Sequence, residues 1–536
     1  MMRSPRLSLA CLGLLAAMSC AAPIQAKTLV FCSEGNPETL NPQLAVTGTA
    51  MDAAHPMFNN LVEYKIGTTT IMPALAESWT VSADGRDYVF KLRRGVRFHS
   101  NALFTPTRDF DARDVVFSLM RQWKSDHPYH ATEGGGFAYF QDMGMADLLE
   151  NVDAPDDHTV RIRLTRAEAP FLSDLAMSFN AILSAEYADV LLKAGKKELF
   201  DTQPIGTGPY TFASYRPNVT IRYRAFADYW RGRQPIDTLV FSITPTAAAR
   251  LTKLKAGECH ISAFPPPEDA AEIRGDPRLT LHTSEGINVG YLAMNTTRPP
   301  FDDVRVRRAI NMAVDKASIL SAVYPGTGVA AVNPMPPTLW GYNRDIAPYP
   351  YDIEAARRLF AEAGITEGLT VDLWYPEVDR PYAPNGKRIA EMMQADLAKL
   401  GMKLDLRSAE WTDYRDRMQS GDFTLAIFGW YADIGDPDNF LHTLLGCLAA
   451  RVGGNNIARW CDKDFNELVV EAKTMADVAR RTELYAKAQA IFHDQAPWVP
   501  IAHSLFMVAA RKEVKGFIID PLGYHVVETV DLVDAP

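Results

Sequence analysis

The sequence predicts an α/β protein of more than one domain. A strand–helix–strand unit runs from Leu369 to Leu406, and such units build parallel sheets that are covered by helices. A nearly continuous apolar run follows from Phe423 to Phe428, which is typical of a strand buried on both faces. The chain has 536 residues, more than one hydrophobic core normally supports, so two or three domains are expected.

The composition is that of an acidic globular protein. Apolar residues make up 47% of the chain and the net charge is −10, which is not the balance of a disordered chain. An acidic chain lacks the excess of Lys and Arg that neutralises phosphates. The sequence therefore gives no reason to expect nucleic-acid binding.

Residues 1–26 predict a secretory signal peptide. Arg3 and Arg6 precede an apolar run at 7–18, and small residues follow as far as Ala26. The run is too short to span a membrane as a helix. A lipoprotein anchor at Cys20 is the alternative, but the branched aliphatic residue expected before such a cysteine is missing, so we expect a soluble exported form.

Four cysteines follow the signal peptide, and they permit three pairings. Cys447 and Cys461 would close a short loop, which leaves Cys32 with Cys259. No Cys-x-x-Cys spacing occurs, which argues against a zinc site or a thioredoxin-type redox site. An oxidising compartment fits this cysteine usage better.

The first part of the chain predicts short strands and a capped helix. A strand is expected over 28–32 and a hairpin over 79–92. Asp111 can cap a helix. With an alternating strand at 160–164, the region up to about residue 204 is interpreted as a compact α+β unit.

A stretch rich in Pro and Gly, at 204–209, separates this unit from the next. Two alternating strands at 210–224 and a strand at 239–243 follow. If Cys32 pairs with Cys259, the first strand belongs with this later unit. The region between would then be an insertion into a discontinuous domain.

The second half begins with an apolar strand at 288–295. Helical spacing follows at 302–317 and 352–364, before the strand–helix–strand unit. Two more helices lie between 465 and 493, and a last segment at 498–510 crosses back.

The stretch Gly429–Phe440 is the first candidate site. Trp430 ends the buried strand, and Asp433 follows where Gly435 and Pro437 force a turn. Ligands collect beyond the carboxyl ends of strands in open α/β sheets, and a carboxylate beside an indole suits an organic cation. The alternative makes Asp433 a turn residue and Trp430 a core residue. Asp436 and Asp438 we assign to the turn and to helix capping.

Two further side chains are expected at the same sheet edge. Arg380 follows the strand that ends near Tyr375, and Trp411 follows the strand that ends at Leu406. Arg is suited to bidentate binding of a carboxylate, so these residues and Asp433 could recognise a zwitterion. An ion pair between Arg380 and Asp433, with both tryptophans in the core, is an equally good interpretation.

Motifs of catalysis are missing. The chain has no Gly-x-Ser-x-Gly, no His-Glu-x-x-His and no phosphate-loop Lys-Ser/Thr motif. His127 and His130 lack an acidic partner, so a surface loop is favoured over a metal site. Gly134-Gly135-Gly136 lacks the strand-to-helix context of a nucleotide-binding loop.

Several stretches resemble one protein family. They are Lys27–Val30, Lys65–Thr69, Ala76–Trp79, Pro204–Pro209, Asp302–Arg307, Gly435–Phe440 and Arg511–Gly516. On these residues the chain resembles the peptide- and nickel-type solute-binding proteins of bacterial ABC importers, and among them the dipeptide-binding branch. The likeness runs from Lys27 almost to the C-terminus.

The resemblance implies an α/β fold of the periplasmic-binding-protein type (type II, the large three-domain cluster), with two lobes that close around a ligand. It supports the discontinuous first domain and both disulfides. The implied division is a signal peptide (1–26), a discontinuous first-lobe domain (27–57, 205–285 and 505–536), an inserted α+β domain (58–204) and a second lobe (286–504).

The resemblance also implies roles for individual residues. In the family, the Asp of the Trp-x-x-Asp segment holds the α-ammonium group of a peptide, and here that is Asp433. The Arg before Pro-Tyr holds the C-terminal carboxylate in the dipeptide branch, and here that is Arg380. The remaining members of the expected ligand-binding set are Trp411, Trp430, Tyr382, Thr47, Gly48 and Phe137. Phe137 replaces a Tyr of close relatives, and the segment 45–49 also differs.

The expected function is that of a periplasmic receptor of an ABC importer. It would bind dipeptides as a monomer, without metal, cofactor or catalytic activity, and deliver them to the inner-membrane permease. Within the family, the alternatives are a tripeptide, an opine or another small cationic or zwitterionic ligand. A secreted peptidase is the alternative from another class, and the missing motifs argue against it.

Overall fold

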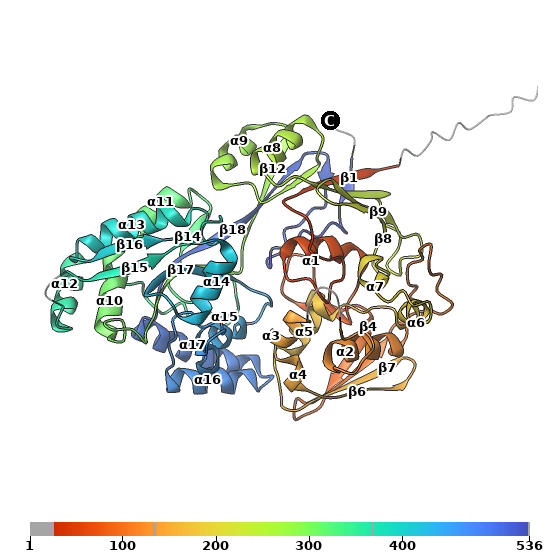
Figure 1. Ribbon diagram of the computed structural model, residues 1–536, viewed down its shortest axis with the longest axis horizontal. Coiled ribbons are helices and arrows are strands. Elements are labelled where there is room, and N and C mark those ends of the chain that lie inside the picture. Colours follow the sequence, from red (N-terminus) through yellow and green to blue (C-terminus); the bar gives the residue numbers. More distant parts are fainter. Residues whose placement is uncertain (1–25, 132–135, 366–367, 534–536) are drawn as a thin grey trace, which may run out of the picture.

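One long strand, β18 (Trp498–Arg511), connects two bodies of α/β structure (Figure 1). Its first half pairs with β13 (Asn288–Met294), and its second half pairs with β12 (Leu279–Glu285). The chain passes from β12 to β13 at Gly286 and Ile287. Two neighbouring segments therefore cross between the bodies, at the positions where the sequence predicts the crossings.

The computed structural model describes residues 26–131, 136–365 and 368–533. The predicted signal peptide, except Ala26, lies outside the described residues, and so do Cys20 and Gly134-Gly135. In the described part of the chain, no helix is long and apolar enough to cross a membrane.

The first body is a mixed sheet whose strands come from distant parts of the chain. β1 pairs in parallel with β10 and β11, and β11 continues onto β18. The elements of this body are β1 (Thr28–Ser33), α1 (Gly48–Ala54), β8 (Tyr210–Arg216), β9 (Thr220–Ala225), β10 (Thr238–Ile243), α8 (Ala247–Ala256), β11 (Ile261–Ala263) and α9 (Ala270–Gly275).

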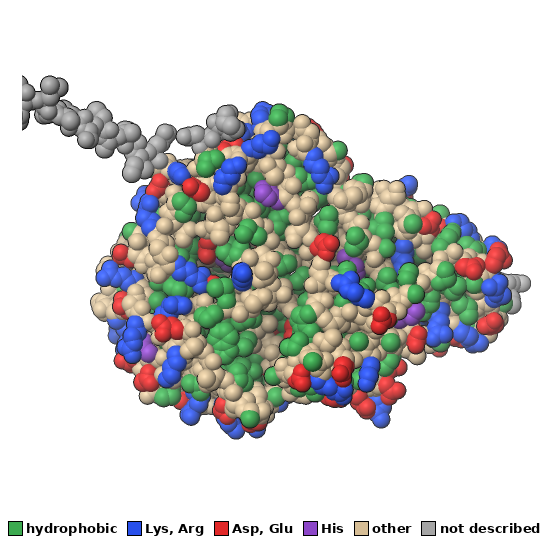
Figure 2. All heavy atoms as spheres, turned by 180° about the vertical axis from the view of Figure 1, so that it is seen from behind, with side chains coloured by type: hydrophobic (Ala, Val, Ile, Leu, Met, Phe, Trp, Pro, Cys, Tyr) green, Lys and Arg blue, Asp and Glu red, His purple; other side chains and the backbone are tan. Residues whose placement is uncertain are grey.

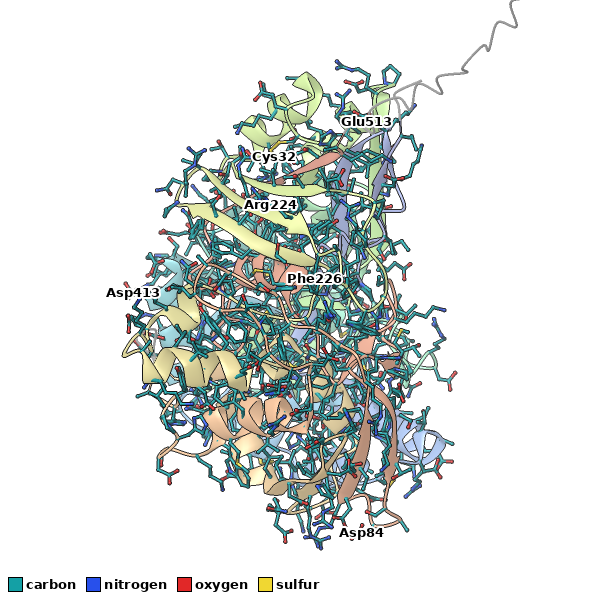
Figure 3. The ribbon with its side chains drawn as sticks, turned by 90° about the vertical axis from the view of Figure 1, so that its right-hand side faces the viewer. Cys32, Asp84, Arg224, Phe226, Asp413 and Glu513 are labelled. Carbon is teal, nitrogen blue, oxygen red and sulfur yellow. A yellow bond between two sulfur atoms is a disulfide. The ribbon has the colours of Figure 1, made fainter. Side chains whose placement is uncertain are left out.

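A disulfide closes this arrangement. The structure joins Cys32 of β1 to Cys259 before β11, with the Cα atoms 5.9 Å apart, and joins Cys447 to Cys461, with the Cα atoms 4.7 Å apart. These are the pairs that the sequence predicts. Figure 3 shows Cys32 and Asp84 far apart, toward opposite ends of the molecule.

The region between β1 and β8 forms its own four-stranded sheet, in the order β4-β5-β7-β6. Asp111 caps α2 in a reciprocal capping box with Asp114. Side chains of this region and of the first body share one hydrophobic core, which includes Phe31 and Phe90. The elements are β4 (Ala76–Val81), β5 (Asp87–Leu92), α2 (Ala112–Trp123), α3 (Ala138–Asp142), β6 (Leu149–Asp156), β7 (Thr159–Leu164), α5 (Phe171–Ala176) and α6 (Ala185–Lys193).

The second body is a sheet in the order β16-β15-β17-β13-β18, with helices around it (Figure 1). β15 runs parallel to both β16 and β17, as the strand–helix–strand pattern predicts. Asp352 caps α12, and Gly364 follows that helix with a φ of 82°. The elements are α10 (Val304–Ala313), α12 (Ile353–Glu362), β15 (Thr370–Trp374), α13 (Gly386–Ala398), β16 (Lys403–Arg407), α14 (Trp411–Ser420), β17 (Leu425–Tyr431), α15 (Asp438–Leu445), α16 (Lys463–Lys473) and α17 (Val478–Gln495).

Candidate functional site

Asn439, in the first turn of α15, organises the residues that follow β17. Its side-chain oxygen accepts hydrogen bonds from the Trp430 indole (2.8 Å) and from the backbone N–H of Asp433 (3.0 Å). Its amide nitrogen donates to the Asp433 carboxylate at 3.3 Å. One side chain thus holds both residues that the sequence places at the end of this strand. No pattern in the sequence indicates this role for Asn439.

The Asp433 carboxylate has no cationic partner within the part of the chain that the structure describes. Tyr139 of α3 donates a hydrogen bond to its other oxygen at 3.3 Å. Burial raises the pKa of Asp433 to about 6, although the hydrogen bonds from Asn439 and Tyr139 lower it. Among the described residues, no Lys, Arg or His forms an ion pair with this carboxylate. A ligand cation would therefore find an uncompensated negative charge here.

Asp436 and Asp438 differ from Asp433 because both are paired. Asp436 forms a buried ion pair with Arg481 at 2.7 Å, and it accepts the backbone N–H of Asp438 at 2.9 Å. Asp438 lies 3.3 Å from the Lys473 ammonium. Both carboxylates are therefore used within the protein, in the turn and at the start of α15.

Arg380 also lacks a charged partner in the described structure. Its guanidinium carbon lies 4.0 Å from the centre of the Trp411 ring, a cation–π geometry. Its Nε atom is buried and has no hydrogen-bond partner. No ion pair joins Arg380 to Asp433 or to another described carboxylate, so the ion-pair alternative left open by the sequence does not occur in this structure.

Tyr382 lies on the sheet where two glycines face each other. Gly290 of β13 is paired with Gly429 of β17. A Cβ atom at Gly429 would lie 2.2 Å from the Tyr382 ring, and one at Gly290 would lie 2.2 Å from the Tyr382 carbonyl oxygen. Tyr324 donates to the same carbonyl at 2.7 Å. The glycines therefore allow the loop that carries Arg380 to lie directly against the sheet.

The two predicted tryptophans are half-buried rather than core residues. The Trp411 ring is nearly parallel to that of Phe428, with centroids 6.3 Å apart. The Tyr414 ring lies 6.0 Å away, and the Arg380 guanidinium also contacts Trp411. Trp411 and Trp430 can thus offer flat apolar surface beside the two charged groups.

The remaining predicted residues have contacts of other kinds in this structure. Thr47 caps α1 by accepting the N–H of Ala50 at 3.2 Å, and both Thr47 and Gly48 are exposed. Phe137 is buried in the core, where the Arg121 guanidinium lies 5.2 Å from its ring. The segment that contains Phe137 instead brings Tyr139 to Asp433.

The two bodies face each other across a furrow, and hydrophobic side chains gather on both of its sides (Figure 2). The hydrogen bond from Tyr139 to Asp433 joins the two bodies. A second one runs from the backbone N–H of Gly435 to the Tyr64 hydroxyl at 3.3 Å. Lys473 forms an ion pair with Glu168 at 2.9 Å. The unpaired Asp433 therefore belongs to the second body but lies against the region inserted between β1 and β8.

No group of three or more His, Cys, Asp or Glu side chains that could hold a metal ion occurs in the part of the chain that the structure describes. The candidate site is thus built from two opposite charges and aromatic side chains.

Comparisons with known proteins agree with this arrangement. Residues 70–451 match the model of the bacterial extracellular solute-binding proteins, family 5 (middle). The chain is 50% identical to the dipeptide-binding protein of Escherichia coli K12, over 97% of this chain and 98% of the relative. It is 48% identical to heme-binding protein A of Haemophilus influenzae, over 93% of this chain and 91% of the relative.

The structural comparison includes a liganded relative. The dipeptide-binding protein of Pseudoalteromonas sp. SM9913, in complex with Met-Leu, superposes with a TM-score of 0.83 and 35% identity, over 95% of this chain and all of the other chain. The two-lobed α/β fold and the family resemblance predicted from the sequence are confirmed. The chain belongs to family 5 of the bacterial extracellular solute-binding proteins.

Proposed function

We propose that this protein is the periplasmic receptor of an ABC importer for dipeptides, and that it hands its ligand to the membrane permease without chemical change. The observation that carries the proposal is the pair of uncompensated charges, Asp433 and Arg380, which follow neighbouring strands of one sheet. A dipeptide zwitterion has an ammonium and a carboxylate for these two groups. The name of the Escherichia coli relative, and the Met-Leu complex of the Pseudoalteromonas relative, support this ligand class.

The proposed site consists of Asp433 for the ammonium, Arg380 for the carboxylate, and Trp411, Trp430 and Tyr382 as its walls. We retain Thr47 and Gly48 as first-lobe candidates, and we add Tyr139. We also propose the predicted domain division, with 58–204 as an inserted domain, and a monomeric state.

Calorimetry with blocked ligands tests the two ends separately. Wild type should bind an unmodified dipeptide, bind an N-acetylated one poorly because it lacks the ammonium, and bind a C-amidated one poorly because it lacks the carboxylate. Removing one partner of a buried charge pair costs about 3–5 kcal/mol. Asp433→Ala and Arg380→Ala should therefore each weaken binding by roughly two to three orders of magnitude.

A surface ion pair supplies matched controls. Arg97 and Asp228 lie 3.1 Å apart with more than half of each side chain exposed, and such pairs contribute little. Arg97→Ala and Asp228→Ala should bind like wild type. Unchanged dipeptide affinity in Asp433→Ala would make Asp433 a turn residue only. Native mass spectrometry of the purified protein would identify a tripeptide, an opine or another ligand, and recovery of cleaved dipeptide would show a peptidase.

A further inference from the structure

The segment after β18 returns to the interface between the two bodies. Within it, Tyr524 packs against the second body's core, which includes Phe440 and Trp498. It also packs, together with Tyr139, against the small cluster around Ala50 and Met51 of α1. Tyr524 therefore contacts both bodies beside the tyrosine that donates to Asp433.

The backbone around Tyr524 is fixed by its neighbours. The next residue, His525, donates its backbone N–H to the Asp52 carboxylate at 2.9 Å, and its ring nitrogen lies 2.6 Å from the other carboxylate oxygen. The His525 ring also contacts the rings of Phe31 and Phe264, at 5.0 and 4.8 Å between centroids. Asp52 belongs to α1, so the same helix supports Tyr524 and fixes its neighbour.

A second set of contacts holds the residues just before Tyr524. The Ile287 N–H donates to the Pro521 carbonyl at 3.1 Å, and Asp520 accepts the N–H of Leu522 at 2.8 Å. Ile287 lies where the chain crosses between the bodies. The position of Tyr524 is thus tied to the crossing as well as to α1.

The Tyr524 hydroxyl takes part in no hydrogen bond among the described residues, in contrast to the hydroxyls of Tyr139 and Tyr64, which contact Asp433 and Gly435. Burial and the nearby charge of Asp433 both raise the pKa of Tyr524, so the hydroxyl keeps its proton at neutral pH. A protonated phenol can donate one hydrogen bond and still accept others.

We propose that Tyr524 contacts the ligand directly, as a hydrogen-bond acceptor that completes the ammonium site begun by Asp433. An ammonium group has three N–H donors, whereas the Asp433 carboxylate already accepts hydrogen bonds from Asn439 and Tyr139. A neighbouring phenol supplies a further oxygen and an aromatic face for the cation. The proposal rests on the proposed function, and it makes Tyr524 a residue that selects for unsubstituted amino termini.

The test compares a dipeptide with its N,N-dimethyl derivative. The derivative keeps the positive charge but has only one N–H donor in place of three. Tyr524→Phe removes only the hydroxyl. It should weaken the unmodified dipeptide roughly tenfold, as expected for a hydrogen bond to a charged group. It should weaken the dimethyl derivative much less, so the variant discriminates less between the two ligands than wild type does.

Tyr351→Phe is the matched control, because Tyr351 is exposed and its hydroxyl accepts a hydrogen bond from Lys399 at 3.0 Å. It should bind both ligands like wild type, and the thermal unfolding of both variants should match that of wild type. Equal affinities of Tyr524→Phe and wild type for both ligands would overturn this inference alone. Failure of wild type to bind any dipeptide would overturn the proposed function and this inference with it.

Discussion

Asp433 is partly buried and has no cationic partner among the described residues, and this makes its protonation part of ligand binding. Burial raises the pKa of its carboxyl to about 6, against the effect of its hydrogen bonds, while Asp142 adds a smaller increase. An ammonium ligand needs the ionised carboxylate. Below the pKa of the free site, protons compete with the ligand, whereas above it they do not.

We therefore expect dipeptide affinity to be highest near pH 7. It should fall slightly toward pH 8, because the α-amino group of the ligand loses its proton with a pKa of about 7.7–8.0. It should fall more strongly below about pH 6, approaching a tenfold loss per pH unit. Calorimetry between pH 5 and pH 8 measures this profile. Asp433→Asn, which keeps the shape without the charge, should bind weakly and show a much flatter profile. An equally steep fall in Asp433→Asn would assign the titration to another group.

At the scale of residues, position along predicted strands is what identifies a site. The positions of Asp433, Trp430 and Arg380 could be predicted because each lies at the end of a strand, or just after one, whose apolar pattern is clear. Tyr139 could not, since it lies 294 residues from Asp433 and no local pattern links the two. Asn439 could not be recognised either, because a polar residue in the first turn of a helix has a common structural explanation.

At the scale of elements, strong periodicity and caps predict well, and short elements do not. The hairpins, α2, α12 and the β15–α13–β16 unit form where the sequence predicts them. Helix α1 has seven residues and β14 (Gly328–Ala330) has three, too few for a period to show. They form because tertiary partners exist: β14 pairs with β18, and α1 packs its Ala50 and Met51 against Tyr139 and Tyr524.

The paired glycines on β13 and β17 give a prediction about an element. Gly429→Ala would place a Cβ atom 2.2 Å from the Tyr382 ring, so the loop that carries Arg380 must move. Overpacking of this kind costs about 1–3 kcal/mol. We expect a lower melting temperature and at least a tenfold loss of dipeptide affinity, with less selection against the C-amidated ligand because Arg380 is displaced.

Gly275→Ala is the control for this substitution, because a Cβ atom at Gly275 meets no atom within 4 Å. It should leave both stability and affinity close to wild type. If Gly429→Ala keeps the wild-type affinity and selectivity, the close contact between Tyr382 and the sheet does not position Arg380.

At the scale of the whole molecule, the sequence predicts the topology only through its cysteines and its crossings. The predicted pairing of Cys32 with Cys259 indicates that the first strand belongs with the later unit, and in the structure β1 does pair with β10 and β11. Contacts between the bodies could not be predicted, because they join surfaces that carry no periodic signal. The clearest of these contacts is the ion pair between Lys473, at the end of α16, and Glu168.

Lys473 of the second body binds two buried carboxylates, Glu168 of the inserted region and Asp438 of its own body. Its ammonium lies 2.9 Å from Glu168 and 3.3 Å from Asp438, and its backbone carbonyl accepts the Ala169 N–H at 2.8 Å. Asp438 starts α15, the helix whose Asn439 holds Asp433. The contact between the bodies and the proposed ammonium site thus share one short helix.

Lys473→Met should loosen the contact between the bodies. It removes the cation that Glu168 and Asp438 share, although Arg166 still lies 3.3 Å from Glu168. Loss of one partner of a buried ion pair costs up to about 3–5 kcal/mol, and separation of the bodies relieves this cost by hydrating both carboxylates. Small-angle scattering of the ligand-free variant should show a larger radius of gyration than wild type. Dipeptide affinity should fall as well, because binding must first restore the contact.

Lys463→Met on the same helix separates this effect from loss of a surface charge. Lys463 lies 3.6 Å from Glu467 with both side chains mostly exposed, so its variant should keep the radius and affinity of wild type. The double variant Lys473→Met/Glu168→Gln lacks one of the two buried negative charges that Lys473 neutralises. Its radius of gyration should therefore return part of the way to that of wild type. If Lys473→Met folds normally and has the radius of gyration and dipeptide affinity of wild type, the ion pair does not hold the bodies together. The remaining contacts would then suffice, among them Tyr139 with Asp433 and Tyr64 with Gly435.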